Sequence, residues 1–346
     1  MNANSAQALT HSDALKAQIS AWTRDTYGAA SSALAIAPLG GHSGVTIGFD
    51  VLDGSRLVER LVLKIPPPGV ARKNNFDVLR QVPLLQALEQ SGIPAPRARF
   101  WSDDERAFGA PYLMMSRLPG ASPPDLFQAA AERGFEDAGN RFERAMDVLV
   151  DIHAIDVDGS LAGWNAVREP VAEIEHWANI LRRATDPVWL GLGYAVRDLL
   201  HDTMPADMPR GLVHGDYYSN NWVFDGARFS GAVDWEGASI GPSLLDVGWA
   251  CMIYDRDCWG PMRRGSMGWQ PQPEQLIARY AERSAWHLDD LGWYRALAGY
   301  RLACITAYYF EEHRSGRRPN DAWEVFGESF PLLMGKAQKL LQTRLG

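Results

Sequence analysis

The chain of 346 residues has few cysteines, fewer basic than acidic residues and no long apolar run. Its three cysteines, Cys251, Cys258 and Cys304, are too few for a disulfide framework, and none belongs to a C-x-x-C pair. Because no run of 18 apolar residues is present, we expect no transmembrane helix and no membrane partner. Lys and Arg number 34 against 42 Asp and Glu, which argues against a nucleic-acid partner.

The N-terminal residues lack the marks of a targeting signal. The sequence MNANSAQALTH has no charged segment followed by an apolar one, so we expect no signal peptide and a cytoplasmic protein. Residues 1–10 are polar and are expected to form a loose tail. Nothing in the sequence indicates an oligomeric state.

The first third of the chain has the pattern of a small α+β region. Leu15, Ile19 and Trp22 recur at helical spacing and predict a helix over residues 12–27. Apolar alternation predicts a strand over 45–52, and Asp53-Gly54 predicts a hairpin turn into a strand over 57–65. The remaining elements expected here are a helix over 76–90 and strands over 97–101 and 112–117.

Beyond Pro119 the pattern becomes mostly helical. The exception is the stretch from Gly211 to Gly241, which reads as loop, strand, turn and strand. We therefore expect an α+β fold of two domains, residues 1–118 and residues 119–346, with no internal repeat.

One segment of the larger domain carries the residue types that phosphoryl transfer needs. Asp216 and Asn221 stand five positions apart on a loop between apolar runs, and Asp234 follows 18 residues after Asp216. Such a set can supply one carboxylate near an attacking hydroxyl, and a carboxylate and an amide oxygen for Mg²⁺. No Walker A sequence is present, so a P-loop NTPase is not supported.

Three motifs in this order resemble those of the aminoglycoside phosphotransferase and choline kinase family. The H-G-D-x-x-x-x-N motif of that family matches His214, Gly215, Asp216 and Asn221. Its I-D-[WF]-E motif matches Val233, Asp234, Trp235 and Glu236, and its trailing aspartate matches Asp246. The resemblance covers most of residues 30–250 and is loose beyond them.

The resemblance implies a bilobal protein-kinase-like fold. Residues 1–118 would form a small N-lobe with an antiparallel sheet that binds the nucleotide, and residues 119–346 a larger helical C-lobe with the catalytic loop and the acceptor site. Asp216 would be the catalytic base or hydroxyl-orienting carboxylate, and Asn221 and Asp234 the Mg²⁺ ligands. In supporting roles, Asp246 would brace the loop, His214 would order it and Glu236 would complete the metal motif.

The nucleotide would be ATP, with GTP as an open alternative. Gly41, His42, Ser43 and Gly44 lie in a glycine-rich turn whose backbone N–H groups could approach phosphates. Lys64 stands in an apolar strand, where an ammonium is costly unless it reaches water or meets an anion, and the family grips the α- and β-phosphates with a lysine at this position. By the same resemblance, backbone groups of Ser116 and Leu118 would bind adenine under Met115.

One position departs from the family. A glutamate on the following helix usually pairs with the lysine, and here that position falls on Gln81, which cannot neutralise an ammonium. Glu89 or Asp77 could take the place of the missing glutamate, and the sequence favours neither of them. A non-catalytic nucleotide-binding relative is therefore an alternative function.

A second alternative is a serine hydrolase. Residues 237–241 match G-x-S-x-G, which would make Ser239 a nucleophile, with Asp289 or Asp290 as the acid and His313 as the base. The alternating β–α units of such a hydrolase are missing after residue 241, so the phosphotransferase is favoured.

The acceptor is the least determined part of the function. The chain has 13 Trp, 11 Tyr and 12 Phe, and many of them fall between residues 249 and 313. An aromatic pocket would suit a weakly charged or apolar alcohol, or a quaternary amine. We therefore expect a small-molecule O-phosphotransferase for such an alcohol, with an aminoglycoside kinase as the alternative because carboxylates also occur in this segment.

Overall fold

The computed structural model describes residues 13–39, 44–67, 70, 76–123, 138–164 and 167–344. The chain forms two compact units. Unit 1 comprises residues 1–119 and 230–236, and unit 2 comprises residues 120–229 and 237–346. Among the described residues, no helix is both long enough and apolar enough to cross a membrane.

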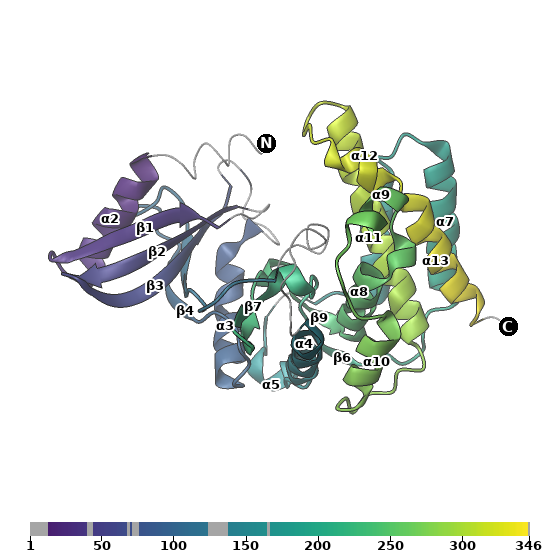
Figure 1. The fold of residues 1–346 in the computed structure, drawn as a ribbon, viewed down its shortest axis with the longest axis horizontal. Coiled ribbons are helices and arrows are strands. Elements are labelled where there is room, and N and C mark those ends of the chain that lie inside the picture. The colour runs from purple at the N-terminus through teal and green to yellow at the C-terminus, as the bar shows by residue number, and fades with distance from the viewer. Residues whose placement is uncertain are drawn as a thin grey trace. The chain divides into compact units, whose positions relative to one another are not determined.

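Unit 1 is built on a five-stranded antiparallel sheet in the order β1-β2-β3-β5-β4 (Figure 1). Its strands are β1 (Ser31–Pro38), β2 (Val45–Asp53), β3 (Arg56–Ile65), β4 (Ala98–Ser102) and β5 (Tyr112–Ser116). The predicted hairpin between β2 and β3 is confirmed, because Asp53 pairs with Arg56 and Gly54 has a φ of 58°.

The core of unit 1 lies between this sheet and helix α2 (Asp13–Tyr27). Leu15, Ile19 and Trp22 face the sheet, as their helical spacing predicts, and pack with side chains such as Phe49. The Trp22 ring meets the Phe49 ring edge to face at 6.3 Å, and its Nε1 donates to the Tyr112 hydroxyl at 3.2 Å. The buried indole is thus both packed and hydrogen-bonded.

The helix predicted over residues 76–90 is shorter than expected. A 3₁₀ turn, η2 (Val78–Arg80), comes first and is capped by the Asp77 side chain, which accepts from the Leu79 N–H. Helix α3 (Gln81–Gln90) follows, with Pro83 in its first turn. A longer helix would need a hydrogen bond from residue 83 to residue 79, and proline has no N–H to make it.

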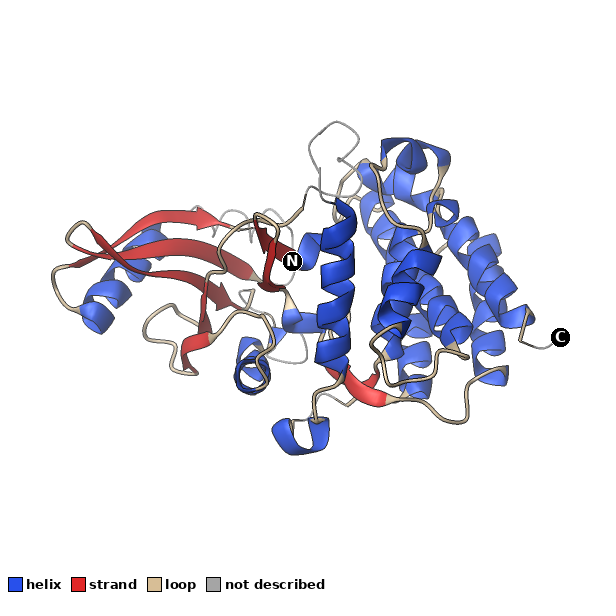
Figure 2. Ribbon diagram, turned by 60° about the horizontal axis from the view of Figure 1, so that its bottom comes forward, coloured by secondary structure: helices blue, strands red, loops and turns tan. Residues whose placement is uncertain are grey.

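Unit 2 is mostly helical (Figure 2). Its long helix α11 (Leu291–Arg314) is buried along most of its length and has its main contacts with other helices of the unit. These are α6 (Pro170–Leu181), α7 (Pro187–Asp202), α8 (Leu244–Tyr254), α12 (Ala322–Gly327) and α13 (Phe330–Gln342). The others described are α4 (Ala138–His153), α5 (Val157–Ser160), α9 (Pro261–Ser266) and α10 (Pro273–Ala281), with 3₁₀ turns η3 (Ser219–Asn221) and η5 (Arg256–Cys258).

The stretch from Gly211 to Gly241 contains more strands than the pattern predicts. It holds β6 (Arg210–Val213), β7 (Trp222–Asp225), β8 (Arg228–Ala232) and β9 (Ser239–Pro242), and the turn η4 (Trp235–Gly237). Strand β6 pairs with β9, and β7 pairs with β8. Each strand has only four or five residues, which is too short for an alternating pattern to stand out.

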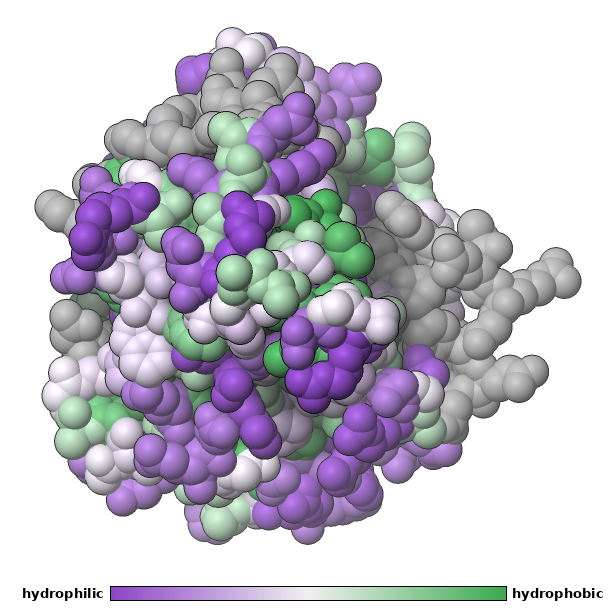
Figure 3. All heavy atoms as spheres, turned by 90° about the vertical axis from the view of Figure 1, so that its left-hand side faces the viewer, coloured by the Kyte–Doolittle hydropathy of each residue, from purple (hydrophilic) through white to green (hydrophobic). Residues whose placement is uncertain are grey.

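Hydrophilic side chains dominate the face shown in Figure 3, with smaller groups of hydrophobic ones between them. Exposed apolar side chains on unit 1 include Leu57 and Val58, which are 44% and 41% exposed. Scattered exposed apolar residues are normal for a folded domain and carry no functional argument.

The packing of unit 1 can be tested at Phe49. Because its side chain is fully buried, Phe49→Ala is expected to lower the free energy of unfolding by about 3–5 kcal/mol. Val58→Ala on the adjacent strand is the matched control and should cost about 1 kcal/mol or less. Denaturant unfolding measures both, and equal losses would contradict this description of the core.

Candidate active site

The segment with the first motif forms the loop between β6 and β7. His214, Gly215 and Asp216 follow β6 directly, and Asn221 ends the turn η3 just before β7. His214 is fully buried and Asp216 is partly exposed. The loop thus presents the Asp216 carboxylate while the residues around it are held inside unit 2.

Asp246, in the first turn of α8, anchors this loop. Its Oδ2 accepts from the His214 N–H at 2.6 Å, and its Oδ1 accepts from the Gly215 N–H at 2.8 Å. The Asp246 side chain is fully buried, so its charge is tolerable only because several donors surround it. The two bonds fix the backbone immediately before Asp216.

Sequence reasoning missed His153, the last residue of α4, as part of this anchor. Its Nε2 lies 3.3 Å from Asp246 Oδ2, and its Nδ1 lies 2.7 Å from the Tyr280 hydroxyl. A carboxylate can only accept, so the hydrogen of the contact with Asp246 is on His153 Nε2, and burial raises the pKa of the Tyr280 hydroxyl beside Nδ1. His153 then donates from Nε2 to the Asp246 carboxylate, and its ring stacks on Trp286 at 5.6 Å.

Asn221 holds the carboxylate of Asp216. Its Nδ2 donates to Asp216 Oδ2 at 2.9 Å and to the Asp216 carbonyl at 2.8 Å. The amide nitrogen faces Asp216, so the Oδ1 of Asn221 is directed away from it and is suited to a cation. The predicted pair of Asp216 and Asn221 is therefore in direct contact.

Aromatic side chains support the rest of the loop. The Tyr254 hydroxyl accepts from the Ser219 N–H at 2.7 Å, and the buried Trp222 ring packs against Tyr217 and Tyr254. Trp235, beside the second motif, is also buried and donates from Nε1 to the Ala232 carbonyl. Both motifs are thus fixed by tryptophans next to them.

The second motif meets Lys64 inside unit 1. Lys64 Nζ lies 3.2 Å from Asp234 Oδ1 and 3.1 Å from Glu236 Oε2. Burial alone would lower the pKa of the Lys64 ammonium, but the two carboxylates outweigh burial and hold this pKa above its ordinary value. Lys64 is therefore a protonated cation, and its partners come from the metal motif.

Asp234 has a backbone conformation that side chains rarely adopt. Its φ is 65°, in the left-handed region, where a residue other than glycine is strained. Such strain persists only where surrounding contacts enforce it, and it concentrates at functional sites. Here the Arg80 side chain donates to the Glu236 carbonyl at 3.0 Å and holds the adjacent turn.

The expected partners of Lys64 on and near α3 do not form a hydrogen bond or an ion pair with it. Gln81 is buried and lines the same recess as Lys64 and Glu236, but the hydrogen bonds of Lys64 go to Asp234 and Glu236. Glu89 forms an ion pair with Arg97, and Asp77 caps η2. The two carboxylates of the second motif supply the neutralisation that Gln81 lacks.

The glycine-rich turn is only partly observable. Gly41, His42 and Ser43 lie outside the described residues. Gly44 lines the recess around Lys64, and a Cβ at this position would lie 2.6 Å from the Ile65 carbonyl oxygen. Gly44 is therefore required for the close approach of β2 to β3.

The predicted adenine contacts fall at the end of β5. Met115 is buried, and the Ser116 N–H donates to the Arg97 carbonyl at 2.9 Å. Because this N–H already donates to Arg97, it is not available to adenine. The remaining candidates for adenine binding are the Ser116 carbonyl and the backbone N–H of Leu118.

The hydrolase residues have other partners. Ser239 is buried at the start of β9 and pairs with Val213, so it does not stand on an exposed strand-to-helix turn. Asp290 forms an ion pair with Arg344, and His313 Nε2 lies 3.4 Å from Glu324. These contacts give no support to a nucleophile, acid and base acting together.

Most of the aromatic segment is packed in the core of unit 2. Its tryptophans and tyrosines are mostly core residues: Trp249, Tyr254, Trp259, Trp293, Tyr294 and Tyr300 are each at most 4% exposed. The spacing of these residues is compatible with a core helix and with a pocket wall, and their burial shows that they belong to the core.

A known family matches this arrangement. The phosphotransferase enzyme family matches residues 47–297, which is more than half of the chain. The chain belongs to this family. Its predicted enzyme class, a phosphotransferase, is thereby confirmed at the level of the family.

The chain is also similar to two curated proteins with different names. Mouse acyl-CoA dehydrogenase family member 10 is 24% identical over 278 residues, which is 76% of this chain and 25% of the mouse protein. Homoserine kinase of Pseudomonas aeruginosa strain LESB58 is 27% identical over 230 residues, which is 65% of this chain and 66% of the kinase. The chain thus spans only about a quarter of the length of the mouse relative.

Solved structures share the fold. An aminoglycoside-phosphotransferase-like protein from Ralstonia eutropha JMP134 has a TM-score of 0.74 at 19% identity, over 94% of this chain and 98% of that one. A thermostable mutant of aminoglycoside phosphotransferase APH(4)-Ia, in a complex with ADP and hygromycin B, has a TM-score of 0.60 at 15% identity, over 95% and 99%. The predicted protein-kinase-like fold is confirmed.

The catalytic loop can be tested at Gly215. Its φ is 86°, and a Cβ there would lie 2.7 Å from the Gly237 carbonyl oxygen. Gly163 has a similar φ of 77° with open space around it, so Gly163→Ala is the matched control. We expect Gly163→Ala to cost about 1–2 kcal/mol in unfolding free energy.

Gly215→Ala should cost about 3 kcal/mol or more, because it adds a backbone clash to the same strain. Faster amide exchange at His214 and Gly215 should accompany it. Equal stability of the two variants would contradict the close approach of Gly215 and Gly237.

Proposed function

We propose that this chain transfers the γ-phosphoryl group of ATP to a hydroxyl group of a small molecule. The observation that carries the proposal is the Asp216 carboxylate, which is held by Asn221 on a loop whose preceding N–H groups are fixed by Asp246. A carboxylate on a rigid loop can orient a hydroxyl and accept its proton. Family membership and the homoserine kinase relative support the same reaction.

The nucleotide half of the proposal rests on Lys64. A protonated lysine beside the metal motif suits the α- and β-phosphates, and the ADP bound to the APH(4)-Ia mutant supports nucleotide binding by this fold. ATP is the proposed nucleotide, with GTP as its alternative, and Ser116 and Leu118 are the proposed adenine contacts.

Asp234 and Asn221 are the proposed Mg²⁺ ligands. No group of three or more His, Cys, Asp or Glu in the described part of the chain could hold a metal by itself. A carboxylate and an amide oxygen nevertheless fit Mg²⁺, which takes few protein ligands and is completed by phosphates and water. When bound, the ion neutralises charge on the phosphates.

The proposed reaction moves one proton to Asp216 and one phosphoryl group to the acceptor. The acceptor hydroxyl gives its proton to Asp216 as its oxygen bonds to the γ-phosphorus, and the bond from that phosphorus to the β–γ bridging oxygen breaks. ADP and a phosphate monoester are the products. Lys64, freed from Asp234 and Glu236, stabilises charge on the departing diphosphate.

The acceptor is proposed only as a small-molecule alcohol. Most of the aromatic residues that favoured a weakly charged or apolar alcohol are core residues, and Trp269 is 60% exposed, so they give that choice little support. The carboxylates that favoured an aminoglycoside are also engaged: Asp255 pairs with Lys336 at 2.7 Å, and Glu312 pairs with Arg317.

Asp216→Ala tests the proposal directly. We expect transfer to any accepted alcohol to fall by about 10²–10⁴-fold, because the proton acceptor is lost, while ATP binding stays within about twofold. The measurement is Mg²⁺-dependent ADP formation over a panel of alcohols, with ATP binding by calorimetry.

Asp225→Ala is the control. Asp225 is an exposed carboxylate on the β7–β8 hairpin with a surface partner, Arg228, and its loss should leave transfer intact. Undiminished transfer in Asp216→Ala would refute the assignment of Asp216.

A further inference from the structure

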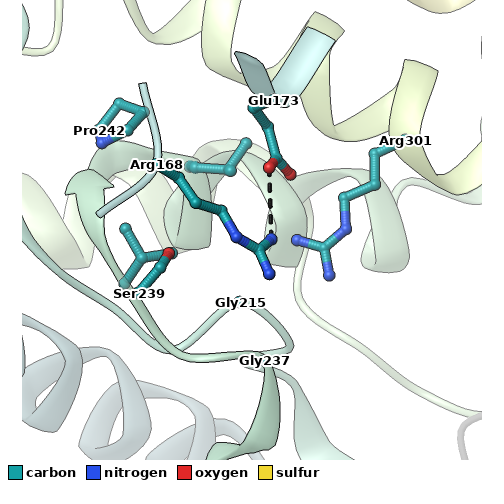
Figure 4. A pocket seen from close by; sticks show the side chains of 9 residues that line it. Arg168, Glu173, Gly215, Gly237, Ser239, Pro242 and Arg301 are labelled. Carbon is teal, nitrogen blue, oxygen red and sulfur yellow. Dashed lines mark hydrogen bonds and ion pairs between the residues drawn. The ribbon is translucent and has the colours of Figure 1, made fainter. Parts of the chain in front are cut away.

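A recess in unit 2 adjoins the catalytic loop. Its enclosed space is small, enough for about one water molecule or the end of a charged group, and its lining includes Gly215, Ser239, Arg168, Glu173 and Arg301. Figure 4 shows the side chains of Arg168 and Arg301 reaching toward each other in this recess, with Glu173 beside them. Gly215 precedes Asp216, so the recess lies one residue from the proposed base.

Glu173 already has partners for both of its oxygens. Its Oε2 lies 3.3 Å from Arg168 Nη1, and its Oε1 accepts from Trp177 Nε1 at 2.7 Å. Burial alone would raise the pKa of Glu173, but the charges of Arg301 and Arg168 and the Trp177 bond hold it below its ordinary value. Glu173 is therefore ionised and oriented toward Arg168.

Arg301 makes no hydrogen bond to any residue that the structure describes. Its guanidinium lies over the Trp249 ring at 4.5 Å and near the Trp177 ring at 5.2 Å, and its buried Nε has no acceptor. Burial lowers the pKa of Arg301 despite the opposing charges of Glu173, Asp216 and Asp246. The cation is thus held between indole rings with its donors unused.

We infer that the acceptor alcohol carries an anionic group, a carboxylate or a phosphate, which Arg301 and Arg168 bind in this recess. The inference rests on the proposed function for its use in transfer. Guanidinium groups bind planar or tetrahedral oxyanions through paired N–H bonds, and such bonds are strongest where water is excluded. Arg168 and Arg301 share the single carboxylate of Glu173, whose oxygens already have partners. The two arginines therefore have N–H donors available for a second anion.

This assignment gives the recess a role in specificity. An oxyanion bound beside Gly215 fixes one end of the acceptor, so a hydroxyl at a suitable distance along the molecule reaches Asp216. A neutral alcohol would offer the Arg301 guanidinium no anionic acceptor, so it would bind less tightly than an anionic one. The chain has a net charge of −8, so it must bind an anion by such local groups.

Paired acceptors test the inference. Hydroxy carboxylates of increasing chain length, each with its primary amide, and the matching alcohols that carry a phosphate monoester are compared for ADP formation. We expect one anionic series to exceed its neutral partner at least tenfold in kcat/KM, and which series does so identifies the oxyanion. Amides that match or exceed both anionic series would overturn the inference.

Variants of Arg301 test whether a preference for the acid over the amide comes from binding in the recess. Arg301→Met should reduce the acid-over-amide ratio to about one, mainly through KM, and Arg301→Lys should restore part of it. Arg182→Met removes an exposed cation of the same unit and should leave the ratio unchanged. A preserved ratio in Arg301→Met would overturn the role of Arg301.

Stability separates a ligand-binding arginine from a structural one. Arg301 makes no hydrogen bond to a described residue, so Arg301→Met should lose only its indole contacts and its attraction to Glu173, and the melting temperature should fall by a few degrees at most. A marked fall in melting temperature, without loss of the acid preference, would make Arg301 structural only.

Binding without turnover separates failure of this inference from failure of the proposed function. Equilibrium dialysis of the preferred hydroxy carboxylate and of its amide, in the wild type and in Arg301→Met, needs no phosphoryl transfer. Selective binding of the acid that Arg301→Met abolishes would support the recess even if no transfer occurs. Equal binding of acid and amide would overturn it even if transfer to other alcohols is observed.

Discussion

The buried carboxylate of Asp246 is the interaction on which the catalytic loop depends. It accepts from two consecutive backbone N–H groups of the loop and from the His153 ring, which the Tyr280 hydroxyl holds in turn. A full charge in the core of unit 2 is stable only while these donors stay in place, so the charge and the loop conformation enforce each other. The position of Asp216 follows from this network.

In unit 1, too, a buried charge is stable only because of its partners. Lys64 can lie in an apolar strand because Asp234 and Glu236 neutralise it, and Asp234 accepts a strained backbone conformation to do so. Under the proposed function, a nucleotide and Mg²⁺ would compete with these pairs, the phosphates for Lys64 and the ion for Asp234. Charge exchange of this kind lets an acidic protein bind a polyanion locally.

Local patterns predicted much of this architecture. The α2 spacing, the β2–β3 hairpin and the three motifs depend on residues close in sequence, where periodicity and turn chemistry act. The partners of Lys64, the role of His153 and the recess around Arg301 depend on contacts between residues far apart in the chain. His153, Arg168 and Arg301 stand in no motif, and the motif that holds Asp234 and Glu236 does not say that they pair with Lys64. In the aromatic-rich segment, helical spacing is the same for core residues and for residues that line a pocket.

The central claim is that Asp234 serves a magnesium–nucleotide complex, and one measurement tests it most directly. ATP binding is titrated calorimetrically with and without Mg²⁺, in the wild type and in Asp234→Asn. The account predicts that Mg²⁺ tightens ATP binding at least tenfold in the wild type and has no such effect in the variant. Equal tightening in both proteins, or none in the wild type, would contradict it.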